Sequence, residues 1–323
     1  MKLSLPFTKK VLSLDIGAYE VKAVEGRMKG QGVKIDNYFT IPVPAAVYDD
    51  GNIVDMELLH HTLAKGLKEN KAKATKTHIT INNSSIITRE VLIPKVEDDA
   101  IDDVLRFQLE DYIPIDPDDY VIQFEIVEEF FEDDVEKLNI LVVAIPKDMV
   151  KEHFELLQNL DLNPVILDYQ PNSISKLIRY GGVLNGEYST QDMTLAIVDM
   201  GHDNTKISII RDGSIQVSRI IDNRGKDVEA ATTDADIMEN FIEDLNQKIE
   251  LVFRYFLSRR SGNRIDMILL TGGNSNIDGI EELFLRDFNI ATTKIESFDN
   301  IDEIDQLHLY INAIGSIIRI AEV

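Results

Sequence analysis

The chain has 323 residues, enough for more than one domain, with 44% hydrophobic residues and no cysteine, so disulfides, thiolate zinc sites and cysteine nucleophiles are excluded. The formal charge of −24 repels phosphate backbones and anionic lipids, which argues against nucleic-acid-binding and membrane-surface proteins. No apolar run reaches the roughly eighteen residues of a membrane span, and no signal-peptide pattern opens the chain, so we expect a cytoplasmic protein.

The first 94 residues alternate strands with one helix. Apolar residues spaced by three or four predict the helix over 55–70. Glycine and proline turn signals bound the strands. We predict these at 11–15, 19–27, 33–42, 77–82 and 85–93.

Residues 95–163 have a different pattern of predicted elements, which indicates a small α/β insert. Two helices are expected at 97–109 and 147–160, the second following a proline that suits a first helical turn. Two strands, 120–131 and 138–145, lie between them. A short strand at 164–168 and a helix at 171–180 then resume the earlier pattern.

The last 130 or so residues repeat the opening theme. Three strands are expected around the Asp212-Gly213 turn, a strong hairpin signal. A continuous apolar face predicts a long helix over 234–260. The elements expected here are strands at 193–199, 204–210, 214–221 and 266–271, and helices at 234–260, from 278, and at 307–321.

Two hairpins in these halves begin with an acid and a glycine. VLSLDIGAYEVKAVE places Asp15 and Gly17 after a buried strand, and TLAIVDMGHDNTKISII places Asp199 and Gly201 likewise. Glycine lets backbone N–H groups approach phosphate oxygens. The carboxylates cannot touch phosphate, so we expect them to hold Mg²⁺ through water. Two such turns facing one another would clamp a nucleoside triphosphate.

A third element, ILLTGGNSNIDGIEELF, ends an apolar strand in Gly272-Gly273 and leads into a helix. A purine ring can lie flat against backbone that carries no side chains. In this order the three elements resemble the actin-like ATPase superfamily: first phosphate loop, second phosphate loop, adenosine loop. Four stretches are more specifically similar to the PilM family of type IV pilus assembly proteins: TINNSSIITREVLIPK (80–95), LEDYIPID (109–116), LDLNPVILD (160–168) and YINAIGSIIR (310–319).

The resemblance implies an α/β, actin-like ATPase fold with two lobes on ribonuclease-H-like cores, an inserted subdomain 1C and a shortened subdomain 2B. The corresponding boundaries are 1–94 for 1A, 95–163 for 1C, 164–189 for 1A continued, 190–222 for 2A, 223–262 for 2B, 263–312 for 2A continued, and 313–323 for a C-terminal helix returning to 1A.

The resemblance also assigns a site for ATP and Mg²⁺. Lys22 matches a lysine that reaches the β- and γ-phosphates in many relatives, and Gln170 or Asn172 is a candidate for orienting a water. Asp15 and Asp199 are the metal candidates. The full set implied for the nucleotide is Asp15, Gly17, Ala18, Lys22, Asp199, Gly201, Thr205, Gly272, Gly273 and Asn274.

Three departures from the family pattern affect this site. Glu20 would oppose phosphate by charge, and we expect it to face solvent. His202-Asp203-Asn204 replaces small residues, and we expect His202 to be a loop residue rather than a catalyst. IDNRGKDVEAATTDAD (221–236) leaves little room for 2B, so half of the purine pocket would be missing, and we expect weakened or lost nucleotide binding and at most slow ATP hydrolysis.

The leading functional hypothesis is a cytoplasmic adaptor of a type IV pilus or related secretion machine. The resemblance implies that a groove between 1A and 1C takes the N-terminal tail of a PilN-like membrane protein. The resemblance also implies contacts with the pilus assembly ATPase and with the platform protein, and it implies that the protein forms an oligomer.

Two alternatives stay open. An FtsA-like filament or division protein usually ends in a basic amphipathic anchor, whereas this chain ends GSIIRIAEV. A small-molecule kinase of the same fold needs a general base beside a substrate hydroxyl, and no kinase motif supplies one.

Overall fold

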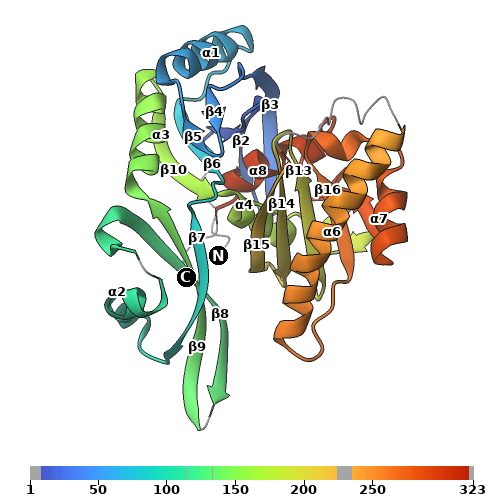
Figure 1. Cartoon of the computed structure of the whole chain (residues 1–323). Helices are drawn as coiled ribbons and strands as arrows, with labels where there is room; N and C mark the ends of the chain where they lie inside the picture. Colours follow the sequence, from blue (N-terminus) through green and yellow to red (C-terminus); the bar gives the residue numbers. More distant parts are fainter. Residues whose placement is uncertain (1–8, 114, 133, 224–234, 320–323) are drawn as a thin grey trace, which may run out of the picture.

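Two five-stranded sheets with the same topology form the cores of two lobes in the computed structural model, which describes residues 9–113, 115–132, 134–223 and 235–319 (Figure 1). The first sheet has the order β10-β6-β1-β2-β3, with β1 antiparallel to β2 and parallel to β6. Its strands are β1 (Val11–Ile16), β2 (Glu20–Lys29), β3 (Gly32–Pro42), β6 (Lys76–Ile81) and β10 (Asn163–Tyr169).

The second sheet repeats this arrangement in the order β17-β16-β13-β14-β15. Strand β13 is antiparallel to β14 and parallel to β16, so β13 is the counterpart of β1. Its strands are β13 (Thr194–Met200), β14 (Asn204–Arg211), β15 (Ser214–Asp222), β16 (Met267–Thr271) and β17 (Thr292–Lys294). The duplicated topology confirms the predicted two-lobed α/β fold.

Helices cover the outer faces of the sheets and fill the space between them (Figure 1). Helices α6 and α7 pack on the second sheet, and α1 and α3 lie on the first lobe. Helices α4 and α8 pack together between the lobes, where α8 contacts β1, β2 and β6 on one side and β16 on the other. The bounds are α1 (Met56–Glu69), α3 (Lys147–Asn159), α4 (Gln170–Tyr180), α6 (Ala235–Arg259), α7 (Ile280–Phe288) and α8 (Leu307–Ile317).

The close approach of α4 and α8 depends on a glycine. A Cβ at Gly315 would lie 2.0 Å from the Ser173 carbonyl oxygen. Any larger residue would therefore force the two helices apart. Within the described residues, no helix is long and apolar enough to cross a membrane.

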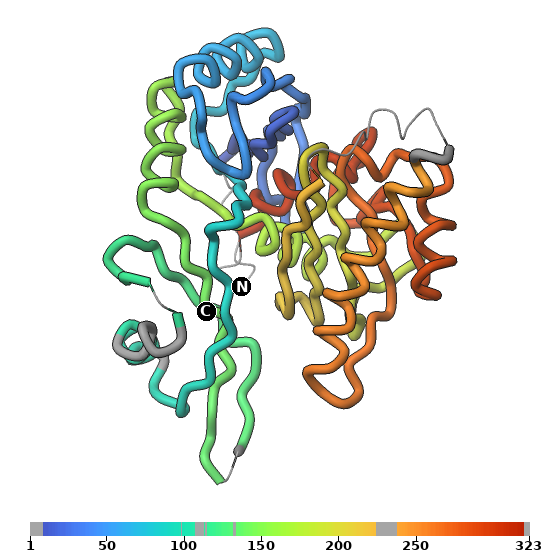
Figure 2. The backbone as a smooth tube through the Cα atoms, viewed as in Figure 1, coloured from blue at the N-terminus to red at the C-terminus, as the bar shows by residue number. Residues whose placement is uncertain are grey.

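The predicted insert contributes β8 and β9 to a separate three-stranded antiparallel sheet, β7-β9-β8, which projects from the first lobe (Figure 2). The third strand, β7, precedes the insert and comes from the segment assigned to 1A. Two arginines at the end of α6 reach this sheet from the second lobe. Arg259 makes a bidentate pair with Glu90, and Arg260 Nη1 lies 2.6 Å from Glu128 Oε2. The elements of the sheet and the insert are β7 (Ile87–Pro94), β8 (Tyr120–Glu132), β9 (Val135–Pro146), α2 (Ile101–Tyr112) and the 3-10 turns η1 (Asp98–Ala100) and η2 (Pro117–Asp119).

The observed helices and strands differ from the predicted ones mainly at their ends and in short elements that were not predicted. The helix expected at 97–109 begins as η1 and continues as α2, because Asp98 to Ala100 form a tighter first turn. The final helix ends at Ile317 rather than 321. Elements too short for a periodic signal were not predicted: β4 (Tyr48–Asp49), β5 (Asn52–Ile53), β11 (Val183–Leu184), β12 (Tyr188–Ser189), β17, and η3 (Gly273–Asn276).

The predicted subdomain boundaries stay a prediction. Of the segment assigned to 2B, residues 224–234 lie outside the described residues, and most of the remainder is α6. The boundary placed at 312–313 falls inside α8, which is one continuous helix from Leu307 to Ile317.

Candidate functional site

The β1–β2 and β13–β14 hairpins have the same turn. In each, the N–H of the turn glycine donates to the carbonyl three residues later, from Gly17 to Glu20 over 3.1 Å and from Gly201 to Asn204 over 3.0 Å. A Cβ at either glycine would lie within 3 Å of that carbonyl oxygen. The turns that follow Asp15 and Asp199, which we call the acid-tipped turns, are therefore equivalent structures, one in each lobe.

The structure brings the two aspartates together. Asn312 on α8 donates from Nδ2 to Asp15 Oδ2 over 3.1 Å and to Asp199 Oδ2 over 3.3 Å. Gln170, the first residue of α4, donates from Nε2 to Asp15 Oδ1 over 2.5 Å. All four side chains are buried. Carboxylates 184 positions apart in the sequence (199 − 15) thus share one amide nitrogen.

The double glycine after β16 packs directly on the second hairpin. Gly272 has φ of 83°, and a Cβ there would lie 2.5 Å from Asp199 Oδ1. Asn274 donates from Nδ2 to the Gly201 carbonyl over 2.7 Å. Glycine is needed at 272 both for its backbone conformation and for the room it leaves Asp199.

These elements surround a cavity of about 320 Å³, which we call the cleft. Thr205 does not line it, since its buried hydroxyl accepts from Asn223 Nδ2 beneath the hairpin. Asn172 lies elsewhere, so only Gln170 of the two water-orienting candidates faces the cleft. The predicted residues that line it are Asp15, Gly17, Ala18, Lys22, Gln170, Asp199, Gly201, Gly273 and Asn274.

The oxygen atoms at the base of the cleft fit a hydrated magnesium ion. Mg²⁺ keeps several waters and is bound by one or two carboxylates, here Asp15 and Asp199. The Oε1 of Gln170, a residue that lines the cleft, is buried without a hydrogen-bond partner in the described part of the chain and can accept from such a water. No group of three or more His, Cys, Asp or Glu residues that could hold a metal ion occurs among the described residues.

Acids outnumber bases around the cleft. Two lysines, Lys22 and Lys206, line it together with five acidic residues: Asp15, Glu20, Asp50, Asp199 and Asp203. The expectation that Glu20 faces solvent is wrong, because Glu20 lines the cleft, where its Oε1 lies 3.4 Å from Lys22 Nζ. An anionic ligand would enter this site only together with a cation.

An aromatic contact joins the two turns at the exposed side of the cleft. The rings of Tyr19 and His202 stack with centroids 4.8 Å apart and planes 10° apart. His202 Nδ1 lies 2.6 Å from Asp203 Oδ1. His202 is thus a loop residue that contacts the opposite lobe. No local sequence signal pointed to this contact.

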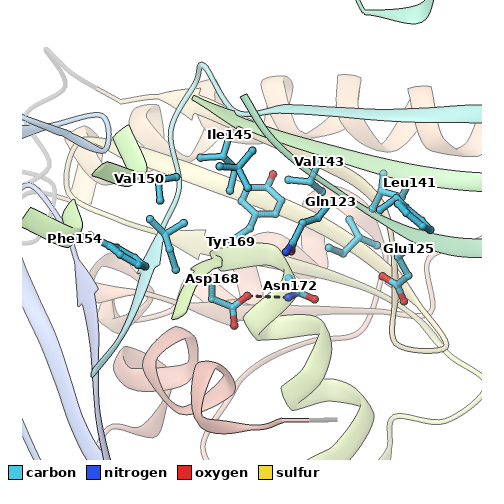
Figure 3. Close-up of a pocket in the computed structure, with 14 residues that line it drawn as sticks. Gln123, Glu125, Leu141, Val143, Ile145, Val150, Phe154, Asp168, Tyr169 and Asn172 are labelled. Carbon is cyan, nitrogen blue, oxygen red and sulfur yellow. Dashed lines mark hydrogen bonds between the residues drawn. The ribbon is translucent and has the colours of Figure 1, made fainter. Parts of the chain in front are cut away.

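A second cavity, of about 280 Å³, lies between the inserted sheet and the first lobe; we call it the groove (Figure 3). Side chains of β8, β9, α3, β10 and α4 line it, and Ile215 of β15 adds one contact from the second lobe. Most of these side chains are apolar, for example Val143, Ile145, Val150 and Phe154. The groove therefore suits an extended apolar segment of a partner.

One end of the groove carries a buried charged cluster around Asp168. Asn172 donates from Nδ2 to Asp168 Oδ1 over 2.8 Å (Figure 3), and Lys176 donates to Oδ2. Arg319 Nη2 lies 3.8 Å from the same oxygen. Burial lowers the pKa of Lys176, and the Asp168 carboxylate opposes that change. The sequence predicted neither this cluster nor the side chains that line the groove.

Comparisons with known proteins agree with this architecture. A protein in the "PilM-PilN type IV pilus biogenesis complex" superposes with a TM-score of 0.80 at 20% identity, covering 96% of this chain and 98% of that one. The ethanolamine utilization protein EutJ from Carboxydothermus hydrogenoformans gives 0.54 at 13% identity over 98% and 90%. MreB5 of Spiroplasma citri bound to ADP gives 0.53 at 14% identity over 96% of each chain.

These structural likenesses show an actin-like fold. The sequence gives the family, because the family model for the type IV pilus assembly protein PilM matches residues 13–230 and 223–313, nearly the whole chain. The chain therefore belongs to the PilM family of type IV pilus assembly proteins.

Proposed function

We propose that this protein is an adaptor of the type IV pilus assembly complex and that its groove binds the N-terminal cytoplasmic segment of a PilN-like membrane protein. The apolar groove between the inserted sheet and the first lobe is the observation that carries the proposal. Support comes from the similar structure, which is named as a complex of PilM with PilN. Its place is then the cytoplasmic face of the membrane, reached through the partner.

The groove favours a short segment with apolar side chains and a cationic group. Its apolar walls bury hydrophobic side chains, which contributes about 25 cal/mol per Å². Glu125 lines the groove, and burial raises the pKa of its carboxyl. A basic residue or an N-terminal amine of the partner would pair with that carboxylate and lower its pKa again.

The second part of the proposal places ATP with Mg²⁺ in the cleft. Asp15 and Asp199 would hold the hydrated ion. The N–H groups of Gly17 and Gly201 bond within their own hairpins, so the other backbone N–H groups of the two turns would face the phosphates. The ion supplies positive charge to a cleft rich in acids. Gln170 donates to Asp15, which leaves Oε1 to accept from a water. Because few residues separate β15 from α6 and leave little room for subdomain 2B, we propose a structural nucleotide with slow or no hydrolysis.

The two sites adjoin through three consecutive residues. Asp168 and Tyr169 line the groove, and Gln170 lines the cleft. The hydroxyl of Tyr169 donates to Ser218 Oγ in the second lobe over 2.9 Å. A nucleotide that sets the angle between the lobes would therefore change the shape of the groove. Contacts with the assembly ATPase and the platform protein belong to the same proposal.

Calorimetry tests the adaptor function directly. The titrant is a synthetic peptide carrying the N-terminal cytoplasmic residues of the PilN-like protein from the same organism, with a scrambled peptide as control. We expect saturable binding of the native sequence, with an affinity that differs between samples with and without ATP and Mg²⁺. If neither condition gives binding above the scrambled peptide, the adaptor proposal fails.

A further inference from the structure

A longer repeat than the two acid-tipped turns is present in the chain. DIGAYEVK (15–22) and DMGHDNTK (199–206) share the pattern D-x-G-x-x-x-x-K. The pattern places a lysine seven positions after each aspartate. Lys22 was predicted to contact phosphate, whereas Lys206 was not among the residues predicted to bind the nucleotide.

The strand pairing gives this repeat a structural meaning. In the first hairpin Asp15 is the cross-strand partner of Lys22, and in the second Asp199 is the partner of Lys206. Directly opposite residues of an antiparallel pair lie on the same face of the sheet. Both lysines line the cleft. Lys206 is therefore the counterpart of Lys22, presented from the opposite lobe.

The two lysines differ in one neighbour. Lys22 lies 3.4 Å from the carboxylate of Glu20, two residues before it. The equivalent position in the second hairpin is Asn204, whose side chain is neutral. In the described part of the chain Lys206 forms no ion pair. Lys22 is thus engaged by a carboxylate two residues away, while the corresponding position beside Lys206 carries no charge.

We propose that Lys206 is a phosphate-binding residue, the second-lobe counterpart of Lys22, for a nucleoside triphosphate held with a divalent cation. The inference rests on the proposed nucleotide site in the cleft. A triphosphate between the two turns has a lysine on each side, and Lys206 contributes more to binding because Lys22 already forms an ion pair with Glu20. A charge-assisted hydrogen bond of this kind is worth about tenfold or more in affinity.

The test is a titration of the full chain with a fluorescent ATP analogue, 2′/3′-methylanthraniloyl-ATP, in the presence of Mg²⁺. We expect Lys206→Gln to raise Kd about tenfold and Lys22→Gln to raise it less. Asn204→Glu keeps Lys206 but supplies the missing acid, and it should also weaken binding. Glu20→Gln should strengthen binding by freeing Lys22. Lys34→Gln, on β3 outside the cleft, is the charge-matched control and should bind as wild type.

Competition with inorganic triphosphate shows which part of the ligand Lys206 contacts. If Lys206 contacts phosphate, Lys206→Gln weakens the competitor as much as the nucleotide analogue. Equal affinity of wild type and Lys206→Gln would overturn this inference and leave the nucleotide site standing. A loss confined to the nucleotide would also overturn it. If the wild-type protein does not bind the analogue, both the Lys206 inference and the proposed nucleotide site are rejected. The adaptor function would then be tested separately by the peptide titration. Thermal unfolding of each variant verifies the fold.

Discussion

The cleft and the groove adjoin in this molecule but are built in opposite ways. The cleft is lined by short, contiguous turns with buried acids, amides and glycines, and it is suited to a charged ligand with a metal ion. The groove is assembled from side chains of six separate strands and helices and is mostly apolar. A rigid polar site of this kind selects chemistry, whereas an apolar groove selects the shape and side chains of a peptide.

The strongest test of this contrast removes an acid from the cleft. Asp15→Ala and Asp199→Ala should each lower the affinity for the fluorescent ATP analogue about a hundredfold or more and abolish its dependence on Mg²⁺, since the water-bound ion loses a carboxylate. Peptide affinity without nucleotide should stay unchanged. Asp305→Ala, an exposed acid outside both sites, serves as control. If both variants still bind the analogue in a Mg²⁺-dependent way, the assignment of Asp15 and Asp199 as the residues that hold the ion would be refuted.

The same contrast explains which parts of the site the sequence predicted. Asp15, Gly17, Asp199, Gly201 and the double glycine were found because each turn is encoded by a few adjacent residues. The two-lobed fold was predicted because a strand-hairpin-helix pattern occurs twice. These signals are local, so no knowledge of the packing was needed.

Asn312 and the groove could not be found in that way. Asn312 lies on α8, more than a hundred residues from either aspartate, and gains its role only when α8 packs between the lobes. Its one local signal is a buried amide within an apolar helix. The groove brings Val121, Phe154 and Ile215 together from three separate elements, and no spacing in the sequence records that contact.

Acid pH tests the contact between the first-lobe sheet and α8, the helix that carries Asn312. His78 on β6 bonds through Nδ1 to the Ser316 carbonyl over 2.8 Å, and burial lowers its pKa from 6.5 to about 4. The folded state thus binds a proton less readily than the unfolded state. Stability is complete above pH 6.5 and is lost as the pH falls toward 4.

We expect the free energy of unfolding to fall by about 2 kcal/mol from this group between pH 6.5 and pH 5, at 1.36 kcal/mol per pH unit. Urea unfolding at both pH values measures it. His78→Asn, which can still donate to Ser316, should show a shallower pH dependence. His153 and His308, whose pKa values burial also lowers, contribute the dependence that remains. An identical slope in variant and wild type would contradict this role.

A charge placed in the groove tests the other half of the comparison. Val121 on β8 lines the groove and is 37% exposed, so Val121→Asp should fold normally. We expect it to lower peptide affinity about tenfold, because a carboxylate would be desolvated by the bound apolar segment. Val135→Asp is the matched control, since Val135 is 48% exposed and lies outside the groove. Nucleotide affinity should not change in either variant, and a parallel loss of both ligands would mean a folding defect instead.

The smallest expected effect tests whether the two sites are coupled. Tyr169 lines the groove, precedes Gln170 of the cleft and donates to Ser218 of the second lobe. If ATP with Mg²⁺ changes peptide affinity a few-fold through the angle between the lobes, Tyr169→Phe should bring that ratio toward one while leaving each separate affinity nearly unchanged. Ser218→Ala removes the same hydrogen bond from the opposite side. The double variant should therefore behave like either single variant, because the bond is lost only once. Additive losses would show that the hydroxyls act independently, and the coupling would then have to pass through α4 and α8.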